Sequence, residues 1–249
     1  MKKNEMVIFT DGSSRGNPGP GGWGSVVLFF DKKKKEERVI ELGGGEIKTT
    51  NNRMEMSAVI ESLKFIEHDL LSNKDGYSVM IYTDSSYLIK GATEWIKGWQ
   101  RKNWIKKDGA EVKNKDLWKD LSELIKRVSI SWEHVPGHAG VVGNERADEI
   151  ACCFADSKNP SLKTVAYKDY SLNLSLPSDS DRKKLYKNKK NKTSKSKKAY
   201  SYVSSVKGQV SVHGDWDSCK KRVAGVSGAL FKKVYSPKEE RELIENWTV

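Results

Sequence analysis

Short apolar runs separated by polar turns cover residues 6–135, and their spacing predicts alternating strands and helices. Between these runs, apolar residues also recur at helical spacing, and Asn51 or Asn52 is available to cap the first helix. A meander of strands that then alternates with helices predicts an α/β fold, a mixed five-stranded sheet flanked by helices. The predicted strands are Met6–Thr10, Trp23–Phe30, Arg38–Gly43, Tyr77–Thr83 and Ser129–Val135. The predicted helices are Met56–Ile66, a short one after Asp84, Leu117–Val128 and Asn144–Phe154.

The pattern changes after residue 156 and divides the chain into three parts. Residues 1–156 form the predicted main domain, and residues 157–199 a flexible linker, because Arg182–Lys198 holds ten Lys/Arg in 17 residues and little apolar surface. Residues 200–249 return to short apolar runs at Tyr200–Val206 and Gln209–His213, then Trp216–Gly225 and Ala229–Val234. A final helix over 237–247 is predicted from Ser236 as cap and Pro237 as first residue. We therefore expect a small α/β module at the C-terminus.

Composition narrows the class of protein and locates the charge. The 249 residues are 37% hydrophobic, too apolar for a fully disordered chain, and carry a net charge of +12. Residues 1–156 hold 24 basic and 24 acidic residues, whereas residues 157–199 hold 13 and 3. The excess charge therefore belongs mainly to the predicted linker, where it would attract polyanions irrespective of sequence.

Several classes are disfavoured by the same composition. We find no run of about 20 apolar residues, no secretory signal pattern, and no Cys/His spacing suited to zinc among the three cysteines. The expectation is a cytoplasmic protein that contacts no membrane.

Four acidic residues fall at the ends of predicted elements. Asp11 and Asp84 end strands, and Glu55 and Asp148 lie in the first turns of helices. Such positions can share one rim of a sheet, where clustered carboxylates favour a hard divalent cation. Two such ions could activate water for phosphodiester hydrolysis. The alternative is that acids occupy turns and caps for local reasons, and that His138 is an ordinary loop histidine.

The sequence around these acids resembles that of type I ribonuclease H over residues 1–156. Four motifs occur in the family's order and spacing. They are Thr10-Asp11-Gly12-Ser13 with Gly16–Gly22, Thr50–Glu55, Tyr82–Ser85, and His134–Gly140 with Gly143–Asp148.

The resemblance implies a ribonuclease H-like fold and a metal-dependent endoribonuclease. It would hydrolyse the RNA strand of RNA–DNA hybrids and leave 5′-phosphate and 3′-hydroxyl ends. Asp11, Glu55, Asp84 and Asp148 would bind two Mg²⁺ ions, for which Mn²⁺ could substitute. His138 would assist proton transfer or product release, and Glu145 and Arg146 would shape the helix start.

The resemblance also implies substrate contacts on both strands. Ser14 and Asn17 would face the RNA ribose, whose 2′-hydroxyl distinguishes RNA. Asn51 and Asn52 would touch base edges, with capping as their alternative role. For the DNA strand, the implied phosphate pocket is Lys48, Thr50 and Asn114, with Trp95 and Trp99 near a channel.

The DNA side departs from the family in two places and leaves one alternative open. Ser86 and Lys107 replace residues common in relatives. Trp95, Trp99 and Trp104 could equally belong to the core.

The segment Trp216–Lys233 resembles the hybrid-binding domain found in many cellular ribonucleases H, although that domain normally precedes the catalytic one. The matching residues are Tyr202, Trp216, Phe231, Lys232 and Lys233. Tyr200 competes with Tyr202 for the first aromatic role, and the alternative places Trp216 and Phe231 in a small core. The partner would be RNA–DNA hybrid or double-stranded RNA, and the protein is expected to be a monomer.

Two rival functions remain open. One is DNA cutting of the integrase or resolvase type on the same fold, which the Trp/Lys segment 95–108 and the Gly-Asn-Pro-Gly loop disfavour. The other is a non-enzymatic nucleic-acid-binding protein, which predicts a lost carboxylate, and none is lost.

Overall fold

The computed structural model describes residues 5–31, 33–70, 78–174, 199–226 and 228–247. The chain divides into two compact units, residues 1–189 and 190–249. Within the described parts, we find no helix with the length and apolar character needed to cross a bilayer.

The first unit is built on a six-stranded mixed sheet in the order β5-β4-β1-β2-β3-β6. Strand β1 pairs parallel with β4, and β4 pairs parallel with β5, whereas β1, β2, β3 and β6 pair antiparallel. The strands are β1 (Glu5–Ser14), β2 (Gly19–Asp31), β3 (Glu36–Thr49), β4 (Ser78–Thr83), β5 (Ser129–His134) and β6 (Thr164–Ala166).

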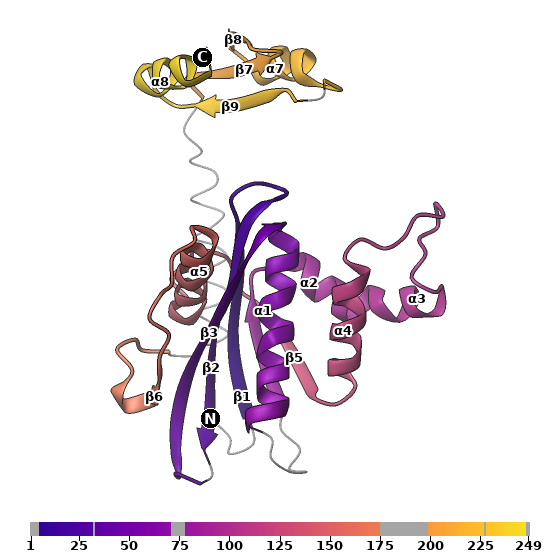
Figure 1. The fold of residues 1–249 in the computed structure, drawn as a ribbon, viewed down its shortest axis with the longest axis vertical. Helices are drawn as coiled ribbons and strands as arrows, with labels where there is room; N and C mark the ends of the chain where they lie inside the picture. Colours follow the sequence, from indigo (N-terminus) through magenta and orange to yellow (C-terminus); the bar gives the residue numbers. More distant parts are fainter. Residues whose placement is uncertain (1–4, 32, 71–77, 175–198, 227, 248–249) are drawn as a thin grey trace. The chain divides into compact units, whose positions relative to one another are not determined.

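Helices cover both faces of this sheet, with α1 and α4 on one side and α5 on the other (Figure 1). Strand β1 alternates accordingly, because Met6 and Ile8 pack on the α1 side and Val7 and Phe9 on the α5 side. The helices are α1 (Asn51–Phe65), α2 (Ser86–Lys90), α3 (Ile96–Arg101), α4 (Lys115–Ile125) and α5 (Val142–Ala155). Single π-helical turns, Ile66–Leu70 and Gly91–Trp95, extend α1 and join α2 to α3.

The strands near the first motif are longer than the sequence predicts. The glycines and prolines of Asp11–Gly22 predict a turn, but β1 continues to Ser14 and β2 begins at Gly19, so much of this segment is paired strand. The glycines serve close packing, because a Cβ on Gly24 would lie 2.2 Å from the carbonyl oxygen of Ala147 in α5. Helix α5 therefore rests almost directly on the backbone of β2.

The sixth strand corrects two predictions. The sheet has six strands because β6 pairs with Arg38–Ile40 of β3. The prediction of a flexible linker from residue 157 is therefore wrong for residues 161–174, in which Tyr170 and Leu174 are buried against the α5 side. These few apolar side chains complete an existing core, so they need no core of their own. The Lys-rich part of the predicted linker, 175–198, lies outside the described residues.

Helix starts agree with the prediction in one case and differ in another. The backbone N–H of Glu239 donates to Ser236 Oγ at 3.2 Å, which confirms Ser236 as a helix cap. Asn51 and Asn52 do not cap α1, because Thr50 occupies the N-cap position.

The second unit is a three-stranded antiparallel sheet with two helices, in the chain order strand, strand, helix, strand, helix. The sheet order is β8-β7-β9, and Val203 on the central strand and Val234 on β9 are fully buried. The elements are β7 (Ser201–Val206), β8 (Gln209–His213), α7 (Trp216–Val223), β9 (Leu230–Val234) and α8 (Pro237–Trp247).

Candidate active site

Asp11 is the most buried of the four predicted carboxylates, with 8% of its surface exposed. The backbone N–H of Gly12 donates to its Oδ1 at 2.7 Å, and Asn144 Nδ2 to its Oδ2 at 3.3 Å. Burial, followed by the charges of Asp84, Asp148 and Glu55, nevertheless raises the pKa of Asp11 to about 8. The structure thus brings all four predicted carboxylates close enough to act on one another.

Glu55 reaches the same region from the second turn of α1. Ser85 Oγ donates a short hydrogen bond to Glu55 Oε2, and Asn51 Nδ2 donates to Oε1 at 2.8 Å. Burial outweighs these bonds and, with the charge of Asp84, raises the pKa of Glu55. The helix can approach β1 because Gly12 has no side chain, since a Cβ there would lie 2.2 Å from the Glu55 backbone nitrogen.

Asp84 follows β4, which lies parallel to β1, so the two strands end at the same edge of the sheet. Its carboxylate touches the loop after β5, and a Cβ on Gly137 would lie 2.1 Å from Asp84 Oδ2. Gly137 is therefore required for this contact, and its role was not predicted. The sequence Pro136-Gly137-His138 could have suggested that another group approaches the backbone closely at this glycine.

Asp148 comes from α5, on the opposite face from Glu55. Its side chain is 27% exposed, and His138 Nδ1 lies 3.6 Å from its Oδ2. His138 has a left-handed backbone with φ of 52° and a side chain that is 79% exposed, so it borders the cluster from a loop. Glu145 supports that loop, because its Oε1 accepts a hydrogen bond from the Gly140 N–H at 2.8 Å.

The donors in this cluster suit a hard divalent cation in their chemistry. All four carboxylates offer oxygen ligands, and the buried Oδ1 of Asn144 beside Asp11 has no hydrogen-bond partner. Across the described residues, no three His, Cys, Asp or Glu side chains are already spaced to hold one ion. The residues therefore fit Mg²⁺ or Mn²⁺ by type and charge, while the carboxylates lie farther apart than the ligands of one bound ion.

The predicted RNA-side residues lie on two segments, the end of β1 with the loop after it and the start of α1. Ser14 Oγ donates to the carbonyl oxygen of Gly16 at 2.8 Å and stabilises the loop that carries the exposed Asn17. Asn51 and Asn52 are exposed at the start of α1. Ser86 and His134 lie beside Asp84, with Ser86 Oγ 3.2 Å from His134 Nε2, which in turn lies 3.1 Å from the Asp84 carbonyl oxygen.

The predicted DNA-side residues lie at the starts of α1 and α4. Arg53 joins these helices through a two-pronged ion pair with Asp116, at 3.0 and 2.8 Å. Thr50 and Asn114 are the residues immediately before the two helices, and Asn114 Nδ2 donates to Tyr87 Oη at 3.3 Å. Lys48 is exposed nearby in sequence at the end of β3.

The tryptophans divide between core and surface. Trp104 is 8% exposed, so its assignment to the core holds, whereas Trp95 and Trp99 are half-buried in an aromatic cluster with Tyr87 and the fully buried Trp118. Ring centroids of Trp95 and Trp99 are 5.6 Å apart. A cavity of about 320 Å³ adjoins them, lined by Glu94, Trp95, Gly98, Trp99, Lys102, Ile105, Lys106 and Lys107.

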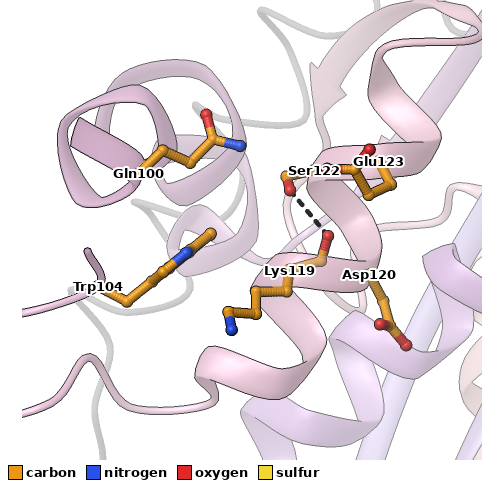
Figure 2. Close-up of a pocket in the computed structure, with 6 residues that line it drawn as sticks. All are labelled: Gln100, Trp104, Lys119, Asp120, Ser122 and Glu123. Carbon is orange, nitrogen blue, oxygen red and sulfur yellow. Dashed lines mark hydrogen bonds between the residues drawn. The ribbon is translucent and has the colours of Figure 1, made fainter. Parts of the chain in front are cut away.

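A second cavity of about 330 Å³ lies between α3 and α4 (Figure 2). Trp104 and Gln100 face α4 across it, and Lys119, Asp120 and Glu123 supply both signs of charge. Ser122 Oγ donates to the Lys119 carbonyl oxygen at 2.8 Å. This cavity has no concentration of one charge that would select a ligand.

The predicted aromatic residues of the second unit form a surface cluster. Trp216 lies between Tyr202 and Phe231, with ring centroids 5.7 and 5.4 Å apart. Trp216 is 38% and Phe231 53% exposed, so the alternative that both form the core is wrong. Tyr202, and not Tyr200, stacks in the cluster. Lys232 and Lys233 follow Phe231 directly on β9, and Lys233 Nζ lies 5.2 Å from the Tyr235 ring.

Comparison with known proteins gives a consistent result for the first unit. The family model described as RNase H matches residues 3–155. A Ribonuclease H of Methylobacillus flagellatus is 48% identical over 151 residues, which are 61% of this chain and 91% of that protein. A Ribonuclease H of a Cyanothece species is 48% identical over 164 residues, covering 66% of this chain and 97% of that protein.

A solved structure is similar in fold as well. It is titled as LC9-RNase H1, a type 1 RNase H with the type 2 active-site motif. The TM-score is 0.58 at 29% identity, and the match covers 70% of this chain and 83% of the other. The match to the family model lies within the first unit and ends before the segment 161–174.

Proposed function

The chain belongs to the ribonuclease H family, and from that premise we propose that it hydrolyses the RNA strand of RNA–DNA hybrids by a two-metal-ion mechanism. Its identity of about 48% with curated ribonucleases H makes it a metal-dependent endonuclease. The observation that carries the finer proposal is the convergence of Asp84, Asp148 and Glu55 on the buried Asp11.

The raised pKa of Asp11 explains why this cluster needs cations. Mutually repelling carboxylates out of water favour protonation, and a divalent ion offsets the repulsion while keeping them ionised. Asp11, Glu55, Asp84 and Asp148 would hold two Mg²⁺ ions, or Mn²⁺ in their place. Bound ions supply an activated water and stabilise the leaving oxygen.

The chain's own side chains supply orientation and proton handling. His138 Nδ1, 3.6 Å from Asp148, is placed to take or give a proton at the edge of the cluster. Ser85 and Asn51 hold the Glu55 carboxylate by its two oxygens. Attack of water on the scissile phosphorus with the 3′ oxygen as leaving group would leave 5′-phosphate and 3′-hydroxyl ends.

Selection of RNA would rest on the loops around the cluster. Ser14 ends β1 and Asn17 lies in the loop that follows, where a ribose 2′-hydroxyl can exchange hydrogen bonds with polar side chains and backbone. Asn51 and Asn52 would contact base edges. Lys48, Thr50 and Asn114 would bind a phosphate of the DNA strand, with Trp95 and Trp99 packing along the same strand.

The proposal is tested with end-labelled RNA–DNA hybrid, double-stranded RNA and double-stranded DNA, each with Mg²⁺. We expect cleavage of the hybrid's RNA strand alone, with 5′-phosphate products, and none with excess chelator. Asp11→Asn should abolish cleavage, whereas Asp120→Asn, an exposed acid on α4, should leave it unchanged. Equal cleavage of double-stranded DNA, or full activity in Asp11→Asn, would refute the proposal.

A second function is supported by the second unit. The exposed aromatic cluster Tyr202, Trp216 and Phe231, followed by Lys232 and Lys233, suits sugars and phosphates of a nucleic-acid duplex. We propose that it tethers the enzyme to hybrid or to double-stranded RNA.

The tether is tested by measuring the Kd of the full chain for long hybrid in chelator, so that no cleavage occurs. Trp216→Ala and Phe231→Ala should each raise it roughly tenfold. Val212→Ala, an exposed apolar residue outside the cluster, is the control. An unchanged Kd in both cluster variants would rule out the tether, and a parallel titration with double-stranded RNA decides between the two ligands.

A further inference from the structure

The segment 161–174, which we call the strap, folds onto the first unit beyond the end of the family match. Its β6 pairs with β3, and the Glu41 N–H donates to the Lys163 carbonyl oxygen at 2.8 Å. Tyr170 and Leu174 are only 7% and 2% exposed. The strap is therefore a built part of this unit.

The strap meets α5 at one buried carboxylate. Glu41 of β3 is 3% exposed. It accepts hydrogen bonds from Arg146 at 2.8 and 3.0 Å, from Tyr170 Oη at 2.6 Å and from the Lys163 N–H at 3.0 Å. Two of its four donors belong to the strap, and the other two to one guanidinium on α5. A buried carboxylate with this many donors is held in one position.

The guanidinium so held belongs to the residue two positions before Asp148. Arg146 also donates to Glu149 at 3.1 Å and to the strap's Ser161 carbonyl oxygen at 3.5 Å. Elsewhere α5 lies on β2 at Gly22 and Gly24, where the helix backbone approaches so closely that a Cβ would lie 2.3 Å from Ala151 O and 2.2 Å from Ala147 O. The glycines allow this approach but offer no side chains, and the apolar packing of Ile150 in the core on this side of the sheet is not directional. Arg146 therefore supplies a directional anchor that the glycines lack.

We propose that Glu41 and Tyr170 are positioning residues for Asp148. Through Arg146 they fix the height and rotation of α5, and so the distance at which Asp148 meets Asp11 and Asp84. Their loss weakens divalent-cation binding at the carboxylate cluster without removing any ligand. The inference rests on the proposed function, because it assigns the cation site to those four carboxylates.

The test compares full-length Tyr170→Phe with Tyr167→Phe, a matched control. Tyr167 lies in the same strap, but its hydroxyl donates to Asn173 at 3.3 Å and not to Glu41. Mg²⁺ binding is measured by calorimetry without nucleic acid, at a temperature where circular dichroism shows every variant folded. We expect Tyr170→Phe to raise the Kd for Mg²⁺ roughly three- to tenfold, the loss of one hydrogen bond to a charged group. Tyr167→Phe should match wild type.

Glu41→Gln gives a second variant with a larger expected effect, since it keeps the side-chain shape but removes the buried charged partner of Arg146 and leaves only the exposed Glu149. Amide hydrogen exchange over 142–155 should accelerate in Tyr170→Phe and Glu41→Gln, and not in Tyr167→Phe. In hybrid cleavage, the Mg²⁺ concentration for half-maximal rate should rise, while the rate at saturating Mg²⁺ recovers towards wild type.

A merely structural role gives a different pattern. If the strap variants melt at lower temperature but bind Mg²⁺ as wild type does when folded, the positioning role is overturned. A wild-type chain that binds Mg²⁺ in this strap-dependent way but leaves hybrid intact would instead refute the proposed function. The two failures are thus distinguishable.

Discussion

Two buried carboxylates in the first unit, Asp11 and Glu41, have pKa values shifted in opposite directions. Asp11 is 8% exposed and its pKa is raised to about 8, because burial is reinforced by the charges of three other acids. Glu41 is 3% exposed, and burial acts on it too, but hydrogen bonds from Arg146 and Tyr170 outweigh burial and lower its pKa. The difference lies in the neighbours of each group, since burial is similar.

The contrast distinguishes the carboxylate cluster, where we propose that cations bind, from Glu41, a carboxylate that holds the structure together. An uncompensated carboxylate cluster is costly for the metal-free fold and becomes favourable only when cations arrive. A carboxylate surrounded by donors is complete without any ligand. The cluster at Asp11 therefore marks chemistry, whereas Glu41 marks architecture that holds α5.

The substitution with the largest expected effect on this contrast between Asp11 and Glu41 is Asp11→Asn. Removing one acid from the cluster should lower kcat on hybrid by at least about 1000-fold, equivalent to about 4 kcal/mol. The same change should increase the free energy of unfolding of the metal-free protein, because folding no longer has to protonate a carboxylate or bury it as a repelling charge. Steady-state cleavage and urea unfolding in chelator measure the two effects. Loss of both activity and stability would mean that Asp11 is a structural group.

Glu41→Ala should act in the opposite direction on stability. It leaves the Arg146 charge, the Tyr170 hydroxyl and the Lys163 N–H without their shared acceptor, so the free energy of unfolding should fall by about 3 kcal/mol. Urea unfolding at neutral pH measures it. Glu37→Ala, on the same strand, provides the comparison, and an equal loss there would contradict the special role of Glu41.

The two pKa shifts also predict opposite pH dependences of the metal-free protein. Because the pKa of Asp11 is raised on folding, the folded state binds its proton more tightly, and stability falls as pH rises towards about 8. Because the pKa of Glu41 is lowered, stability falls as pH drops below its usual range. Thermal melting across pH should lose most of its decline from about pH 4 to pH 8 in Asp11→Asn, and its decline at lower pH in Glu41→Gln. Saturating Mg²⁺ should also remove the decline from about pH 4 to pH 8.

The sequence predicted the site better than its support. Asp11, Glu55, Asp84 and Asp148 could be proposed because each stands in a local motif at or near the predicted end of an element, and the parallel strands β1 and β4 bring two of these ends to one edge. Glu41 and Tyr170 are 129 positions apart, and neither stands in a pattern that predicts burial or pairing. Their partnership exists only once β3, α5 and the strap are assembled.

The same limit explains the errors in the fold. The glycines and prolines up to Gly22 predict a turn because these residues favour turns locally, yet α5 requires glycine at Gly22 of β2. Residues 161–174 fall in the predicted linker because the prediction extends the composition of Arg182–Lys198 to all of 157–199, although half of these fourteen residues are apolar. Tyr170 and Leu174 find a core that already exists. Local pattern predicts elements that form their own contacts and misses those that complete another element's surface.

His138→Ala tests the border of the carboxylate cluster and should have a moderate effect. Its ring is exposed and lies 3.6 Å from Asp148, so its loss removes proton handling but no cation ligand. We expect kcat to fall roughly tenfold, with the Mg²⁺ dependence unchanged. His213→Ala, in the second unit, is the control for histidine removal. A shifted Mg²⁺ dependence would instead make His138 part of the cation site.

The smallest predicted effect concerns Ser85. Its hydroxyl donates one hydrogen bond to the Glu55 carboxylate, whereas the Glu41 carboxylate accepts four hydrogen bonds. That hydrogen bond lowers the pKa of Glu55 against the larger effect of burial, so Ser85→Ala should raise the pKa further. Cleavage needs the ionised carboxylate, so the acidic limb of the rate profile should move to higher pH. The rate at pH 6 should fall roughly two- to fivefold and recover at pH 8. Ser86→Ala, the neighbouring hydroxyl that contacts His134, should leave the acidic limb in place. A rate loss of equal size at both pH values would show that Ser85 matters through its cap on α2, where it accepts from the Leu88 N–H at 3.1 Å, and not through the charge of Glu55.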